Sequence, residues 1–329
     1  MSTPRVYVIH ENPEWFPPLA AAFEAEGVPV QEILLTEGQV DLASEPEPGV
    51  YWSRMSASSH TRGHEHAKEY TRALLGHLER AGRQVVGGSH VLELEVSKVA
   101  QHGLLQRAGF DVPRTTAVFG TAPLKDAART FTDGQDVPFI TKHNQGGKGL
   151  GVRRFDSLAE FDAYVDSPDF EEPVDGITLL QEYLTAREPF ITRVEFVGGE
   201  FVYAVRVDTS AGSFELCPAD ACEVPQVNAG AVCDVPGTGQ QSAFSVRTEV
   251  TAQHPLVQQL RAFLADQRIQ IAGVEFMETT DGRTVVYDIN TNTNYNPAVE
   301  ETAPASGPRS IARYLGGLLA AEYAPQLTA

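Results

Sequence analysis

Two distant segments of the chain hold residues that could do chemistry together. In the first, Lys142 ends an apolar run and is followed by glycines at 146, 147, 149 and 151. Glycine lets a backbone approach phosphate oxygens closely and turn its N–H groups toward them. In the second, Glu275, Asp288 and Asn290 offer hard oxygen ligands of the kind that Mg²⁺ prefers. Together the two segments predict a site for a nucleotide phosphate and a magnesium ion.

The glycine-rich loop has neither the GxxxxGK[ST] pattern of a P-loop nor a GxGxxG that opens a helix. Residues 152–155 after it are typical of a strand. The loop is therefore expected to join two antiparallel strands and to fold over phosphates as a flap. An ordinary glycine hairpin with an exposed lysine would show the same pattern, so the loop alone leaves both interpretations open.

The carboxylates of the second segment fall on two predicted strands joined through a turn at 279–282. Asp288 and Asn290 are two residues apart, so their side chains point to one face of a strand. Polar residues on the wet face of a hairpin are the plain alternative. Glu275 and Asp288 interrupt apolar runs, however, and a carboxylate in such a setting needs a partner or a metal.

The composition limits the partners. The 329 residues carry a net charge of −19, whereas nucleic-acid binding needs clustered lysine and arginine. The hydrophobic share of 42% suits a globular protein of two or three compact units. No apolar run reaches the roughly 18 residues of a membrane span, and the N-terminus lacks a signal-peptide pattern. We therefore expect a cytoplasmic protein that binds neither nucleic acid nor membrane.

Strand and helix patterns alternate through the first third of the chain, which favours a parallel sheet covered by helices. The predicted strands there are 6–9, 30–35, 50–52 and 85–86, and the predicted helices are 14–26 and 64–81. Further strands are expected at 115–118, 139–141, 178–181, 191–196, 201–207, 274–277 and 284–289. Further helices are expected at 95–108, 122–131, 157–165, 255–267 and 310–322. Residues 208–245 are predicted to form an extended loop or lid.

The ordered set of these residues resembles the ATP-grasp superfamily, and within it the RimK-like α-L-glutamate ligase branch. The set runs from Lys98 in a helix through the glycine loop, the segment 179–184, Arg193 and Arg206 to the acidic group. The resemblance implies an α/β (α+β) fold with a parallel N-terminal α/β domain at 1–94. Two α+β subdomains, at 95–180 and 181–329, would then sandwich ATP.

The resemblance also assigns roles to single residues. ATP would be held by Lys98, Lys142, Gly146, Gly147, Gly149, Gln181, Glu182, Tyr183 and Leu184. One or two Mg²⁺ ions, with Mn²⁺ as a substitute, would be held by Glu275, Asp288 and Asn290. The γ-phosphate and the acyl-phosphate formed from it would face Lys142, Arg193 and Arg206. The substrate would contact Arg54 and Ser56.

Three departures from the family pattern concern the site. Glu275 precedes Asp288, where the family commonly has Asp and then Glu. The acidic residue that meets ribose should fall near Ile191, and Glu188 is the nearest substitute. The residues after Asn290 alternate threonine and asparagine, and we interpret Asn292 and Asn294 as lining an amino-acid pocket rather than a plain polar loop.

Two smaller clusters could suggest a second metal. Cys217, Cys222 and Cys233 have no CxxC spacing and no fourth ligand, so reduced structural thiols are the better interpretation. His64 and His66 are two apart at a helix start and face different ways, which favours a solvated or substrate-side role for them and for His60.

The function that the resemblance implies is ATP-dependent carboxylate–amine ligation. Amino-acid or peptide-like small molecules would be joined through an acyl-phosphate, with release of ADP and phosphate. A phosphotransferase acting on a small metabolite, a glutamate ligase that modifies a protein tail and a degenerate nucleotide-binding scaffold are the alternatives. A homo-oligomer is left open.

Overall fold

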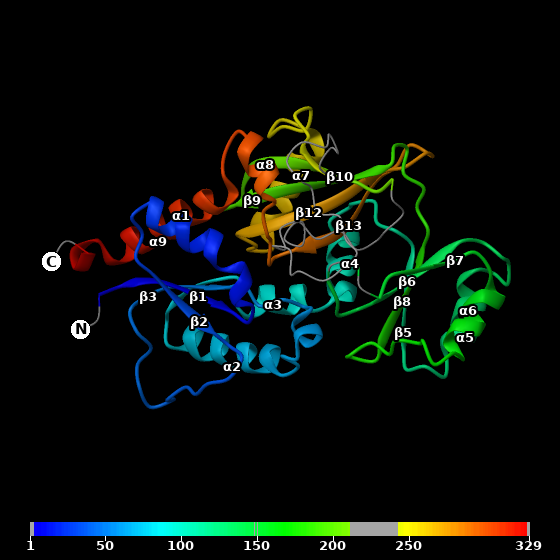
Figure 1. Ribbon diagram of the computed structural model, residues 1–329, viewed down its shortest axis with the longest axis horizontal. Helices are drawn as coiled ribbons and strands as arrows, with labels where there is room; N and C mark the ends of the chain where they lie inside the picture. Colours follow the sequence, from blue (N-terminus) through cyan, green and yellow to red (C-terminus); the bar gives the residue numbers. More distant parts are fainter. Residues whose placement is uncertain (1–2, 148, 150, 211–242, 328–329) are drawn as a thin grey trace, which may run out of the picture.

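The computed structural model of the protein describes residues 3–147, 149, 151–210 and 243–327. Three sheets follow one another along the chain, first a parallel sheet and then two antiparallel sheets (Figure 1). This arrangement confirms the predicted mixed α/β fold class. The exact domain boundaries stay a prediction.

The N-terminal sheet is parallel, with strand order β2-β1-β3-β4. Its strands are β1 (Arg5–His10), β2 (Val30–Leu34), β3 (Gly49–Ser53) and β4 (Gln84–Val86). Its helical segments are η1 (Pro13–Trp15), α1 (Pro17–Ala25), η2 (Ser59–Arg62) and α2 (Ala67–Arg80). Val6 and Val8 pack in one core with α1 and the last helix α9 (Gly307–Leu327), whereas Tyr7 and Ile9 pack in another with α2. Figure 1 shows α2 and α1 on opposite sides of this sheet, as a parallel sheet buried on both faces requires.

The central sheet is antiparallel, with order β5-β8-β6-β7. Its strands are β5 (Thr115–Phe119), β6 (Phe139–His143), β7 (Arg153–Phe155) and β8 (Ile177–Glu182). Helices α5 (Leu124–Phe131) and α6 (Leu158–Val165) cover one face, where Phe139, Phe155 and Phe161 pack edge to face or tilted. The glycine-rich loop joins β6 to the antiparallel β7, as predicted, and its role as a flap over phosphates stays a prediction.

The C-terminal sheet is also antiparallel, with order β11-β10-β9-β12-β13. Its strands are β9 (Phe190–Val197), β10 (Glu200–Asp208), β11 (Phe244–Val246), β12 (Ile271–Glu278) and β13 (Thr284–Asn290). Helices α7 (Pro255–Asp266) and α8 (Pro297–Thr302) follow β11 and β13 in the chain. On β9, Val194 and Phe196 enter the core that contains α7, so the alternate residues Arg193 and Glu195 point to the other face.

The predicted helix at 95–108 corresponds to α4 (Lys98–Arg107), and a separate helix that was not predicted, α3 (Ser89–Glu95), ends just before it. The break arises because Ser97 is extended and its hydroxyl caps α4 by accepting a hydrogen bond from the Ala100 amide at 3.2 Å. Helix α4 packs against β13, so it joins the core of the C-terminal sheet rather than that of the central one.

Three further short elements have no counterpart among the predicted ones, namely η2, β11 and α8. Most of the predicted lid, residues 211–242, lies outside the described part of the chain, and so do all three cysteines. Among the described residues, none of the helices has the length and apolar character that a membrane crossing requires.

Candidate active site

A cavity of about 320 Å³ lies between the three sheets. Its wall takes side chains from α4, β6, β9, β12 and β13, and from loops of the N-terminal domain. The predicted site residues that line it are Ser56, Lys98, Lys142, Gly146, Gly147, Gly149, Gln181, Glu182, Tyr183, Leu184, Arg193, Glu275, Asp288, Asn290, Asn292 and Asn294. Segments far apart in the sequence therefore meet at one place.

A row of charged residues crosses three neighbouring strands on the cavity side. Arg193 on β9 is the cross-strand partner of Glu275 on β12, and Glu275 is the partner of Asp288 on β13. Directly opposed residues of a sheet point to the same face, so the three side chains form one row. The Arg193 Nη1 atom lies 3.4 Å from Glu275 Oε1. The row therefore places the Arg193 guanidinium beside the carboxylates of Glu275 and Asp288.

A β-bulge shapes the acidic end of this row. The register shifts after Glu275, because Glu275 faces Asp288 while the next residue, Phe276, faces Val286. The extra residue is Tyr287, and burial together with the nearby Glu275 and Asp288 carboxylates raises the pKa of its hydroxyl. Bulges re-aim side chains in this way at functional sites.

Two lysines face the acidic end from other elements. Lys98 at the start of α4 donates to Asp288 Oδ1 at 2.5 Å. Burial alone would lower the pKa of Lys98, but Asp288 and Glu275 outweigh it and raise that pKa. Lys142 on β6 has no such bond, and burial together with the neighbouring Lys98 lowers the pKa of Lys142 to about 8. The cavity thus holds two ammonium groups close enough to repel each other.

The donor set of Glu275, Asp288 and Asn290 fits a divalent cation. Burial and the adjacent Asp288 raise the pKa of Glu275, because two neighbouring carboxylates repel each other when both are ionised. Burial would likewise raise the pKa of Asp288, but Lys98 and Lys142 lower it below its ordinary value. The Asn290 amide lies 3.2 Å from Glu275 Oε1. Two carboxylates and an amide at one point suit Mg²⁺.

The cavity also has an apolar part beside the predicted adenine hinge. Ile140, Ile191 and Met277 contribute to its wall there. Residues outside the cavity hold this hinge in place: the Glu182 carboxylate accepts hydrogen bonds from the Arg114 amide and the Arg283 guanidinium. Ile191, where the family would place an acidic residue, is therefore part of the wall but offers no polar group.

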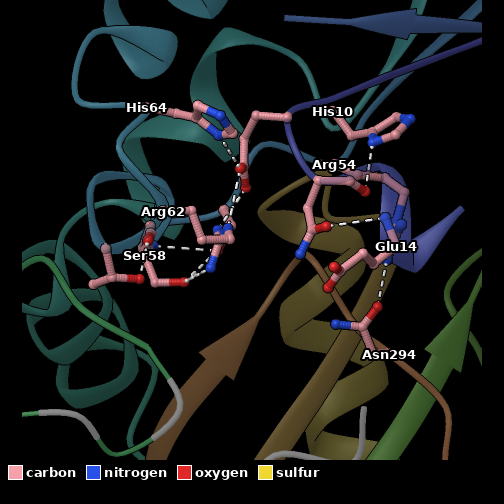
Figure 2. Close-up of polar contacts among 12 residues, drawn as sticks. His10, Glu14, Arg54, Ser58, Arg62, His64 and Asn294 are labelled. Atoms are coloured by element: carbon pink, nitrogen blue, oxygen red, sulfur yellow. Dashed lines mark hydrogen bonds and ion pairs between the residues drawn. The ribbon is translucent and has the colours of Figure 1, made fainter. Parts of the chain in front are cut away.

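Arg54 is buried at the end of β3 and does not itself line the cavity. Its Nη2 atom donates to the Thr293 carbonyl at 3.0 Å and to Asn294 Oδ1 at 2.8 Å, a contact drawn in Figure 2. Its Nε and Nη1 atoms are buried and have no hydrogen-bond partner among the described residues. Burial lowers the pKa of Arg54 to about 10. A buried guanidinium with unused donors is suited to an anionic group that a ligand brings.

A second polar cluster adjoins Arg54 (Figure 2). The buried Glu11 carboxylate accepts from Arg62 at 2.6 and 3.1 Å and meets the His64 ring at 3.0 Å. Arg62 also donates to Ser58, a cavity residue. Among the described residues no group of three or more His, Cys, Asp or Glu side chains could hold a metal ion. The substrate-side or solvated role of His60, His64 and His66 stays a prediction.

Two predicted residues, Arg206 and Glu188, do not line the cavity. Arg206 pairs with Thr192, the neighbour of Arg193, and successive residues of a strand point to opposite faces. The Arg206 guanidinium accordingly stacks 4.4 Å over the Phe190 ring, away from the cavity. Glu188 lines a separate hollow of about 10 Å³ with Phe190 and Thr192. The structure therefore does not bring either residue to the cavity wall, and the predicted contacts of Arg206 with the γ-phosphate and of Glu188 with the ribose stay predictions.

Several wall residues escaped the sequence prediction. Glu95 lines the cavity, and its carboxylate accepts from the Thr291 amide and hydroxyl at 2.8 and 2.7 Å. Tyr287 lines it through the bulge. Both interrupt apolar runs, which was a usable signal. Trp15 also lines the cavity, but nothing in its sequence surroundings indicates this.

Comparison with known proteins gives a clear result for the fold alone. No family model and no curated protein matches the chain. Among solved structures, D-cycloserine synthetase DcsG superposes with a TM-score of 0.64 at 16% identity, covering 95% of this chain and 99% of that one. A RimK domain ATP-grasp protein from Sphaerobacter thermophilus DSM 20745 gives 0.64 at 17% identity, covering 94% and 98%. The chain has the ATP-grasp fold.

A third ATP-grasp structure includes ligands. The ATP-grasp ligase PsnB, complexed with minimal precursor, Mg and ADP, has a TM-score of 0.62 at 15% identity, covering 96% of this chain and 98% of that one. In all three cases the likeness spans nearly the full length of both chains. The predicted ATP-grasp fold, with its N-terminal parallel sheet and two following α+β parts, is therefore confirmed.

Proposed function

We propose that this protein is an ATP-dependent ligase that joins a carboxylate to an amine through an acyl-phosphate. The observation that carries the proposal is the charged row of Arg193, Glu275 and Asp288, which faces Lys98 and Lys142 across one cavity. The likeness in fold to an ATP-grasp ligase solved with Mg and ADP supports the same conclusion.

ATP would lie between the central and C-terminal sheets. The adenine would occupy the apolar part of the cavity beside the hinge at 181–184, where backbone groups can bond its edge. Lys98 and Lys142 would contact the phosphates, and the glycine loop after β6 would close over them. Bound Mg²⁺, held by Glu275, Asp288 and Asn290, would neutralise phosphate charge.

The reaction would then need positioning more than covalent help from the protein. The substrate carboxylate attacks the γ-phosphorus of ATP, the bond to the β-phosphate oxygen breaks, and ADP leaves. Arg193 would stabilise the charge on the transferred group. The amine next attacks the acyl carbon, phosphate leaves, and the amine proton passes to solvent or phosphate. The flap would exclude water, because the acyl-phosphate otherwise hydrolyses.

The substrates in this proposal are amino acids or peptide-like molecules. Arg54 would bind a substrate carboxylate, and Ser56, Asn292 and Asn294 would bind its polar groups. The similar structures include a synthetase named for a small molecule and a ligase complexed with a precursor. Free amino acids and short peptides therefore both belong in a substrate panel.

The test is turnover of ATP across that panel. Purified protein with ATP and Mg²⁺ is given pairs of amino acids or peptides, and ADP, free phosphate and product masses are measured. We expect one pair to release ADP and phosphate together with a product of the summed mass less water. A product that keeps the phosphate, with no free phosphate released, would instead identify a phosphotransferase. Absence of any ATP turnover in the full panel would contradict the ligase.

A further inference from the structure

The Arg193 side chain is held by a buried polar clamp, formed by Glu195 and Thr293. Its Nε atom donates to Glu195 Oε1 at 2.7 Å, and its Nη2 atom donates to the Thr293 hydroxyl at 2.7 Å. The remaining nitrogen, Nη1, faces Glu275 at 3.4 Å. The clamp thus occupies the far side of the guanidinium and turns Nη1 toward the proposed metal ligands.

The two clamp residues also bond to each other. The Thr293 hydroxyl donates to Glu195 Oε2 at 2.8 Å, so the three side chains close a ring of hydrogen bonds. Glu195 is 2% exposed and Thr293 is 1% exposed. A buried network whose members are all paired is rigid, because any rotation leaves a polar group without a partner.

Gly273 provides the space that the clamped guanidinium needs. It lies on β12 between its cross-strand partners Glu195 and Asn290. A Cβ atom at this position would lie 2.5 Å from Arg193 Nε and 2.7 Å from Arg193 Nη2. The guanidinium therefore crosses β12 directly over the glycine.

The N-terminal half of the chain fixes the loop that carries Thr293. Arg54 donates to the Thr293 carbonyl at 3.0 Å, and Glu95 accepts from the Thr291 amide and hydroxyl. The clamp is therefore held at two points: Glu195 belongs to β9, and Thr293 is bonded through its carbonyl to Arg54.

We propose that Glu195 and Thr293 are positioning residues that orient the Arg193 guanidinium toward the transferring phosphoryl group. Gly273 leaves the space that this guanidinium occupies. This inference rests on the proposed function, because it takes Arg193 as the group that meets the phosphate. Neither clamp residue lines the cavity, so both act through Arg193 rather than on a ligand. A charged donor displaced by about 1 Å can lower a rate about 100-fold.

The kinetic test uses paired threonine variants on the full chain. Thr293→Val removes the hydroxyl at nearly constant shape, Thr293→Ser keeps it, and Thr302→Val is a matched change on the exposed side of α8. We expect Thr293→Val to lower kcat about 10- to 100-fold with ATP KM changed less than about threefold. Thr293→Ser and Thr302→Val should stay within about threefold of the parent. An unchanged kcat in Thr293→Val would overturn the proposal.

A spectroscopic test needs neither ATP nor a known substrate. The Nε–H signal of Arg193 in ¹⁵N-arginine-labelled protein is assigned by its loss in Arg193→Lys, and its hydrogen exchange with water is measured. We expect Glu195→Gln and Gly273→Ala to speed this exchange about tenfold or more, because each disturbs the Nε bond.

The two tests separate the possible failures. Rapid exchange in the parent protein, or no change in both variants, would overturn the clamp whatever the activity. If the exchange results hold but no substrate pair turns over, the clamp exists and the proposed ligase function fails. If kcat falls in Thr293→Val while the Nε–H signal of that variant keeps its shift and exchange rate, the effect does not pass through Arg193 and the positioning role is overturned.

Discussion

The cavity has a nucleotide end, around Lys98 and Asp288, and a substrate end, around Asn292 and Asn294. The buried polar groups at the two ends differ in whether they have hydrogen-bond partners within the protein. At the nucleotide end, Lys98 bonds to Asp288, and Glu275 meets both Asn290 and Arg193. Behind the wall of the substrate end, Arg54 keeps two buried nitrogens without a partner among the described residues. The Asn292 side-chain oxygen and the Tyr295 hydroxyl are also buried without a partner in the described part of the chain.

This difference indicates what each end does on binding. At the nucleotide end Lys98 pairs with Asp288 and Arg193 with Glu275, so ATP and Mg²⁺ would exchange these ion pairs for others. At the substrate end the polar atoms have no internal substitute, so a ligand would supply bonds that are otherwise missing. Buried donors without partners are costly, and a ligand that pairs them gains that free energy as affinity.

The largest effect is expected from breaking the nucleotide end. Asp288→Ala removes a proposed metal ligand and the partner of Lys98 together, and Lys142→Ala removes a phosphate contact. Either change should lower ATP turnover about 1000-fold or more, as loss of a group that stabilises transition-state charge does. ADP release and circular dichroism would be measured together. Full activity in either variant would refute this assignment of the site.

A smaller effect is expected from the substrate end. Arg54→Met keeps the approximate volume of the side chain but removes its donors. The KM of the carboxylate substrate should rise about 10- to 100-fold, the range that loss of charged hydrogen bonds gives, while the Kd of ATP stays unchanged. Steady-state kinetics and nucleotide titration would check this. An effect on ATP alone would place Arg54 at the other end of the cavity.

The same two variants should differ in stability. Asp288→Ala leaves the buried Lys98 without its partner, and we expect it to lower the free energy of unfolding by about 2 kcal/mol. Arg54→Met removes a buried charge that no carboxylate pairs, so its change should stay within about 1 kcal/mol. Urea unfolding of both variants without ligands makes the comparison. Equal losses would mean that the two ends are not satisfied differently.

Lys142 predicts a proton change on nucleotide binding. Burial and the neighbouring Lys98 lower its pKa to about 8, and contact with phosphate would raise that pKa again. ATP binding at pH 8 should therefore take up about half a proton, and less at pH 6.5, where Lys142 is already charged. Calorimetry in buffers of different ionisation enthalpy measures the uptake, with Lys142→Met as the control. Proton release, or equal uptake in the control, would contradict the account.

The smallest effect is expected at Glu188. Because this residue lies in a separate hollow beside Phe190, Glu188→Ala should change the Kd of ATP less than about twofold. Titration with a fluorescent ATP analogue is sufficient to measure this. A large loss of affinity would show that Glu188 meets the nucleotide after all.

Local patterns were enough to predict most of the fold and much of the cavity wall. Lys142 and the glycine loop stand out because glycine and lysine follow an apolar strand, and Asp288 because it interrupts one. Arg206 could not be placed correctly in the same way. Which face of β10 it occupies depends on its pairing with Thr192, and that register is set by tertiary structure.

The substrate end was harder to predict for a related reason. Glu95 reaches the cavity because α3 packs beside the loop after β13, and Trp15 reaches it from η1, far away in the sequence. Likewise the Arg193 clamp joins positions 195 and 293, which no local pattern connects. Contacts of this kind depend on how the sheets are placed relative to one another, and a single sequence carries little information about that.

The central claim is that a substrate carboxylate is activated as an acyl-phosphate in this cavity. The most direct measurement uses the substrate pair found in the panel, with ¹⁸O in the carboxylate, and follows the label by mass spectrometry. The account predicts that one ¹⁸O atom appears in the released phosphate for each amide formed. Phosphate free of the label, or phosphate retained on the product, would contradict it.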